Sequence, residues 1–133
     1  MIHKTNVARA LDKLKINYEI LEYEVDLNDL SAIHIAASTK QDIKQIYKTI
    51  VCECEPKNFV VACLQGDLEL DLKALAHACG AKRCELINLK DLEKITGYIR
   101  GGCSPLAMKK HFATFIDERA KEQEYVLVSA GVR

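Results

Sequence analysis

The stretch Tyr47–Leu64, YKTIVCECEPKNFVVACL, decides the fold. Its first part, YKTIVCEC at residues 47–54, has the Thr, Ile and Val content that favours a strand. Its last part, FVVACL at residues 59–64, is a continuous apolar run of strand length, which is typical of a central, buried strand. The sequence EPKN between them is typical of a turn, so we expect an antiparallel hairpin.

Outward from this hairpin, helical and strand patterns alternate without repeats or linkers. Helices are predicted at residues 6–15, 31–38, 72–79 and 88–95, and further strands at 18–25, 82–87, 111–116 and 124–129, the last two around a polar turn at 117–122. Asp71 and Asn88 are suitable N-caps, while Gly80 and Gly97 are suited to ending helices. This mixed order predicts an α+β domain with a mixed sheet or partly closed barrel.

The composition limits the function classes. The chain has 133 residues, 49% of them hydrophobic, which predicts one globular domain. Lys plus Arg and Asp plus Glu each number 19, and this zero formal charge argues against holding bulk nucleic acid by the overall field. No apolar run has the ~20 residues of a membrane span, and the start MIHKTN lacks an apolar signal region. We therefore expect a cytoplasmic protein without a membrane partner.

The cysteines and histidines show no metal-ligand spacing. The six cysteines are Cys52, Cys54, Cys63, Cys79, Cys84 and Cys103, and the four histidines are His3, His34, His77 and His111. An even cysteine count permits three disulfides, but without a signal peptide we expect reduced thiols, several of them buried as small hydrophobes. Since no CxxC pair is present, we expect no metal and no cofactor.

The segment Thr96–Lys110, TGYIRGGCSPLAMKK, carries the strongest candidate site. A glycine pair lets backbone N–H groups approach a ligand oxygen closely, and three basic residues accompany it, as an oxyanion or anion site needs. The alternative is an ordinary turn. Cys103 has no histidine partner in sequence, so we interpret it as oxidation-sensitive rather than catalytic, and Ser104 has no evident base.

Lys48 stands in an otherwise apolar strand and has two interpretations. It is either an edge lysine that protects the sheet from aggregation or a cation aimed into a cleft beside the Gly-Gly loop. Tyr23 and Tyr47 either line the same cleft or serve as packing residues.

Five segments taken in order are similar to one family. KTNVARALD, YKTIV, LDLKALA, TGYIRGGCSPL and YVLVSAG together resemble the YbaK family of free-standing aminoacyl-tRNA deacylases, which are related to the editing domain inserted in bacterial prolyl-tRNA synthetase. The likeness extends from Lys4 to Arg133. It implies a strongly curved mixed sheet and hydrolysis of mischarged Cys-tRNA(Pro). The partners implied are tRNA(Pro) and prolyl-tRNA synthetase.

The resemblance also implies site residues. Lys48, Gly101 and Gly102 match catalytic positions, and Tyr23, Tyr47, Ser104 and Pro105 match substrate-binding positions. Cys103 replaces the usual aliphatic residue, and Ala107 and Ala130 stand where glycine is common. The family usually continues with a final strand and helix, so we expect residues 1–133 to be one editing domain lacking a C-terminal segment.

The implied chemistry needs no protein nucleophile. The substrate's own thiol can attack its ester carbonyl and displace the ribose oxygen, and such an intramolecular step gains greatly from proximity. Three alternatives stay open: a deacylase for Ala-tRNA(Pro) or another small aminoacyl-tRNA, a non-catalytic aminoacyl-tRNA binding module, and a thiol-based redox protein.

Overall fold

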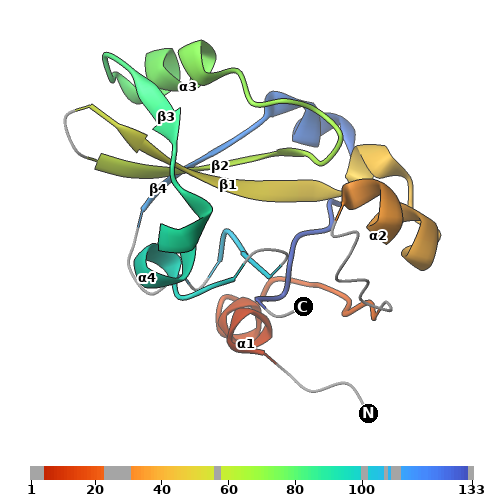
Figure 1. Cartoon of the computed structure of the whole chain (residues 1–133). Helices are drawn as coiled ribbons and strands as arrows, with labels where there is room; N and C mark the ends of the chain where they lie inside the picture. Colours follow the sequence, from red (N-terminus) through yellow and green to blue (C-terminus); the bar gives the residue numbers. More distant parts are fainter. Residues whose placement is uncertain are drawn as a thin grey trace.

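A four-stranded mixed sheet lies at the centre of the part of the chain that the structure describes, as a computed structural model shows (Figure 1). That part comprises residues 5–22, 31–55, 58–99, 102–106, 108 and 112–131. The strands are β1 (Tyr47–Cys54), β2 (Asn58–Gln65), β3 (Cys84–Leu86) and β4 (Ala113–Ile116), in the order β3-β1-β2-β4. The α+β class with a mixed sheet is therefore confirmed.

The predicted hairpin is confirmed residue by residue. Strands β1 and β2 are antiparallel, with a register running from Tyr47 opposite Gln65 to Cys54 opposite Asn58. Strand β3 adds antiparallel to the far end of β1, and β4 adds parallel to β2. Because β3 and β4 are short and form the two edges, the sheet is open, and the expected partly closed barrel is wrong in this respect.

Side-chain caps begin three of the four described α-helices, and left-handed residues end several of them. The helices are α1 (Asn6–Lys13), α2 (Ala32–Thr39), α3 (Leu72–Cys79) and α4 (Leu92–Thr96), with 3₁₀ turns η1 (Ile43–Gln45), η2 (Leu89–Asp91) and η3 (Glu118–Glu122). Asp71 accepts a hydrogen bond from the backbone N–H of Ala74 at 3.0 Å, as predicted for the N-cap of α3. Gly80 and Gly97 follow α3 and α4 with φ of 72° and 83°, values that glycine adopts without strain.

The two faces of the sheet pack against different elements. On one face, alternate residues such as Cys52 and Val60 join Leu75 of α3 in one core cluster. On the other face, Val51 and Val61 join Leu92 of α4 in a second cluster. Figure 1 shows the consequence, with α3 above the sheet and α4 and α1 below it. The sheet thus separates an α3 face from an α4 face.

Two predicted strands do not form in the described residues. Residues 18–22 have no strand partner, the rest of 18–25 lies outside the described residues, and the Tyr18 hydroxyl instead donates to Asp12 of α1 at 2.9 Å. In 124–129, pairing is limited to a single bridge between Leu127 and Ile46. Both segments contain β-formers, but strand propensity is realised only beside a partner strand. None of the helices in the described ranges has the length and apolar character that crossing a membrane requires.

Candidate functional site

The segment after α4 is anchored by a buried threonine. Thr96 is 1% exposed, and its Oγ1 donates to the carbonyl of Leu92 at 2.8 Å. The same oxygen accepts the backbone N–H of Tyr98 at 3.0 Å. Gly97 takes a positive φ directly after α4, so the chain turns sharply there. The hydrogen bonds of Thr96 hold the backbone at this turn, just before the glycine pair.

The loop is then braced by its own polar groups. The Gly102 N–H donates to the carbonyl of Ile99 at 2.9 Å, and the Leu106 N–H donates to Ser104 Oγ at 3.2 Å. The Tyr98 hydroxyl donates to the carbonyl of Leu106 at 2.7 Å. Gly102 and Ser104 are buried, and Pro105 is half-buried. The described polar groups therefore hold the loop in shape.

Other residues that the sequence predicted for this loop are not among those that the structure describes. Gly101 and the basic residues Arg100, Lys109 and Lys110 lie outside the described residues, as does Ala107. The Gly102 N–H already donates to the carbonyl of Ile99, so this donor is engaged within the loop.

Cys103 points into the core on the α4 face. Its side chain packs against the cluster of Val51, Val61 and Leu92. Burial raises the pKa of the Cys103 thiol to about 11; a hydrogen bond with Thr96 acts in the lowering direction, and Cys63 in the raising direction. A thiol that stays protonated at neutral pH is a poor nucleophile, which agrees with its interpretation as non-catalytic.

Lys48 lies half-buried near the start of β1, opposite Leu64 of β2. Side chains alternate along a strand, so Lys48 shares the α3 face with Cys52, whereas Thr49 shares the face that Cys103 packs against. Strand β3 pairs only with residues 52–54, so Lys48 lies in the part of β1 without a β3 neighbour. Within the described ranges Lys48 forms no ion pair. This position fits the edge-lysine interpretation. The structure places Lys48 and Cys103 on opposite faces of the sheet, so it does not bring the predicted cation and the loop together.

Tyr47 has an unusual hydroxyl. The residue is 4% exposed, and its hydroxyl has no hydrogen-bond partner among the described residues. Burial raises the pKa of Tyr47, the charges of Asp117 and Glu122 raise it further, and the charge of Arg119 lowers it. An unsatisfied buried hydroxyl costs about 1–3 kcal/mol, which a polar group of a ligand can recover. Tyr23, the other predicted pocket tyrosine, lies outside the described residues.

Asp117 and Arg119 are neighbours of Tyr47 that the sequence did not identify. They belong to the polar turn after β4, and the Asp117 N–H donates to the carbonyl of Cys63 at 2.9 Å. Arg119 pairs with Asp117 at 2.8 Å. The sequence of a polar turn does not show which residue it will approach, because its position depends on the pairing of β4 with β2, which the tertiary fold sets.

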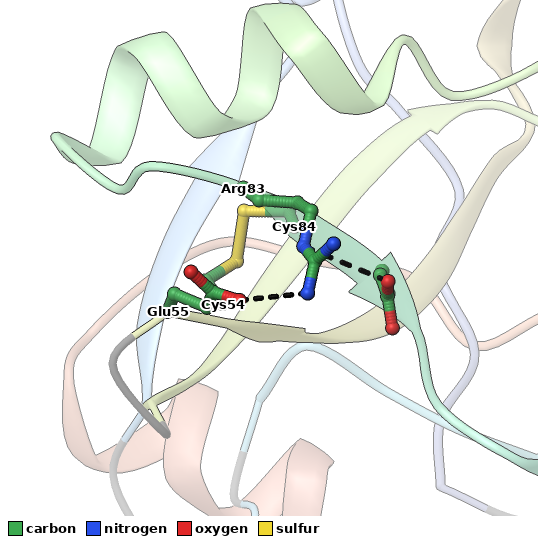
Figure 2. A network of polar contacts seen from close by, with 5 residues as sticks. Cys54, Glu55, Arg83 and Cys84 are labelled. Carbon is green, nitrogen blue, oxygen red and sulfur yellow. Dashed lines mark hydrogen bonds and ion pairs between the residues drawn. A yellow bond between two sulfur atoms is a disulfide. The ribbon is translucent and has the colours of Figure 1, made fainter.

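The expectation that all cysteines are reduced is wrong. Cys54 and Cys84 form a disulfide between facing positions of β1 and β3 (Figure 2). Of the free cysteines, Cys79 at the end of α3 places its sulfur 3.8 Å from that of Cys84. The three sulfurs lie within 4.8 Å of one another, so the fold assembles a cluster that the sequence spacing did not reveal.

Comparison with known proteins identifies the class to which this fold and loop belong. A family model described as the aminoacyl-tRNA editing domain matches residues 29–133. The chain belongs to the aminoacyl-tRNA editing domain family, which confirms the resemblance found in its sequence.

Individual relatives make the likeness more specific. The chain is 45% identical over 130 residues to EbsC of Enterococcus faecalis (strain ATCC 700802 / V583), a candidate Cys-tRNA(Pro)/Cys-tRNA(Cys) deacylase, covering 98% of this chain and 79% of EbsC. The crystal structure of the hypothetical protein APE2540 matches with a TM-score of 0.85 at 18% identity, covering 94% of this chain and 81% of that one. A candidate trans-editing enzyme for prolyl-tRNA synthetase matches with a TM-score of 0.72 at 20% identity, covering 82% and 68%. These two structures support the fold alone.

Proposed function

We propose that this protein is a cytoplasmic aminoacyl-tRNA deacylase that hydrolyses mischarged Cys-tRNA(Pro) in trans. The observation that carries the proposal is the 45% identity to EbsC, because it covers 98% of this chain. The partners are tRNA(Pro) and prolyl-tRNA synthetase. Since the formal net charge is zero, the overall field of the protein holds tRNA weakly, and the synthetase contributes specificity.

The reaction uses the substrate's own sulfur. The cysteinyl thiolate attacks the carbonyl carbon of the ester, the bond from that carbon to the ribose oxygen breaks, and the ribose oxygen takes up a proton. The product is a cyclic thioester, which water then opens to free cysteine. The protein supplies orientation and stabilises the developing oxyanion, which are the two contributions that an intramolecular attack needs.

The proposed roles of the residues follow their positions. Gly101 and Gly102 form the loop that the oxyanion approaches, with Gly102 fixing its shape through the bond to Ile99. Lys48 supplies positive charge. Tyr47, Tyr23, Ser104 and Pro105 surround the substrate, and the buried hydroxyl of Tyr47 has no hydrogen-bond partner among the described residues.

One comparison tests the proposal. The purified protein is incubated with Cys-tRNA(Pro), Ala-tRNA(Pro) and Pro-tRNA(Pro), and the remaining ester is followed over time. We expect rapid loss of the cysteinyl ester and survival of the prolyl ester. Preferential loss of the alanyl ester would instead assign the protein to the alanine-specific deacylases.

A non-catalytic binding module is the second candidate. It is favoured by the engagement of the Gly102 N–H and the Ser104 hydroxyl oxygen within the loop itself. In the same experiment this function predicts retention of Cys-tRNA(Pro) on the protein with no acceleration of ester loss over buffer.

A further inference from the structure

Three cysteine sulfurs converge on the α3 face of the sheet. Cys54 ends β1, Cys79 ends α3 and Cys84 begins β3. Gly80, with φ of 72°, turns the chain directly after Cys79, and the β1–β3 register sets Cys84 opposite Cys54. All three sulfurs lie within 4.8 Å of one another, so three separate elements contribute to one site.

The spacing suits a metal ion bound by thiolates. Sulfurs that bind one tetrahedral Zn²⁺ at about 2.3 Å are themselves ~3.8 Å apart. The sulfurs of Cys79 and Cys84 are 3.8 Å apart. In the disulfide form Cys54 and Cys84 are bonded to each other, and only the reduced form offers three thiolates.

The surroundings suit the charge of such a site. Three thiolates and a divalent ion carry a net charge of −1. A cavity of about 720 Å³ borders Cys84 and is lined by the basic residues Lys73, Lys82 and Arg83, as well as His77. Arg83 also pairs with Glu55 at 2.8 Å beside the disulfide (Figure 2). The cavity gives access to Cys84 and leaves room for a fourth ligand, such as a water molecule.

The cluster is separate from the proposed deacylation site. Cys103, which follows the glycine pair in sequence, packs against the α4 face, whereas Cys54 and Cys84 belong to the core cluster of the α3 face. Along β1, Cys54 is also about 20 Å from Lys48 at the usual rise of a strand.

We propose that Cys54, Cys79 and Cys84 form a redox-gated binding site for a thiophilic divalent metal ion such as Zn²⁺. A dithiol reductant opens the site: its two thiols become a disulfide while the Cys54–Cys84 bond becomes two thiols. The metal ion then displaces the three thiol protons into solvent. An oxidised dithiol reverses the exchange: its disulfide takes up two electrons and two protons to become two thiols while the Cys54–Cys84 bond forms, which removes two ligands and releases the ion.

Zinc titration of the full chain tests this proposal. The protein is reduced with a dithiol, freed of reductant without oxygen, and titrated with Zn²⁺ in competition with a chromophoric chelator. We expect equimolar binding to the reduced protein and none to the oxidised protein. Co²⁺ in place of Zn²⁺ should give the sulfur-to-metal charge-transfer bands of thiolate coordination.

A matched pair of variants separates this site from cysteine content in general. Cys79→Ala should weaken zinc binding by more than about a hundredfold, because losing even an outer-shell partner of a metal site costs 10–100-fold. Cys63→Ala removes a cysteine that contacts Thr49 outside the cluster and should leave binding unchanged. Equal affinity in the wild type and Cys79→Ala would overturn the proposal, as would the absence of binding by the reduced wild type.

A measurement on the wild type alone covers the case in which a variant fails to fold. Zn²⁺ should protect Cys54, Cys79 and Cys84 of the reduced protein from alkylation, as mapped by mass spectrometry of its peptides. Unchanged alkylation of these three residues would overturn the proposal. So would a transfer of the disulfide to Cys79 and Cys84 in place of metal binding.

Discussion

Reduction of the Cys54–Cys84 disulfide should destabilise the folded protein measurably. The bridge joins residues separated by 30 positions and closes β2, α3 and their connections into one loop. The chain-entropy model gives about 3.6 kcal/mol at 25 °C for a loop of this length. For a domain of this size, that loss corresponds to a fall in Tm on the order of 10 °C.

Thermal unfolding followed by circular dichroism, with and without a dithiol, measures this effect. A chelator is present in both samples so that bound metal cannot compensate for the lost bridge. A double variant, Cys54→Ala with Cys84→Ala, serves as the control and should unfold at a Tm that the dithiol does not change. If the wild type also keeps its Tm on reduction, then the bridge does not constrain the unfolded chain and the stability argument fails.

Three further predictions concern the site and its surroundings. Lys48→Ala should slow deacylation by about 10²–10³-fold with an unchanged Tm; a normal rate would remove Lys48 from the site. Gly102→Val should give a folded, inactive protein, since Gly102 is buried and a Cβ there would obstruct the close approach of a ligand, whereas an active variant would show that the loop is merely a turn. Burial raises the pKa of Cys52 and Cys103 to about 11 from 9.0, so the folded state keeps protons that the unfolded chain releases. The contribution of each thiol to the free energy of unfolding should be fully present below pH 9 and should be lost as the pH rises through 11, a loss of about 2–3 kcal/mol per thiol. Urea titrations across that pH range measure this free energy.

Local signals in the sequence predicted much of the fold. The hairpin of β1 and β2 followed from two apolar runs and a turn, and the limits of α3 followed from Asp71 and Gly80. These features depend on neighbours in sequence, since a cap or a turn acts within a few residues. The strand predictions for residues 18–22 and 124–129 were wrong because a strand needs a partner strand, and the tertiary fold decides which segments pair.

The site was only partly predictable for the same reason. The Gly-Gly loop stood out by composition, but the bond between Gly102 and Ile99 depends on the conformation after α4. The pairing of Cys54 with Cys84 required the β1–β3 register, which no cysteine spacing encodes. The unsatisfied hydroxyl of Tyr47 likewise emerges only when the sheet buries it.

The comparison of Cys-tRNA(Pro) with Ser-tRNA(Pro) tests thiol-assisted deacylation most directly. The two aminoacyl groups have nearly the same size, so a steric pocket would barely distinguish them. A hydroxyl is almost wholly protonated at neutral pH, whereas a thiol with a pKa of ~8.5 supplies some thiolate for attack on the ester. If the substrate sulfur is the nucleophile, the enzyme should hydrolyse Cys-tRNA(Pro) far faster than Ser-tRNA(Pro) when both rates are corrected for spontaneous hydrolysis. Near-equal rates would contradict this mechanism and favour water as the nucleophile.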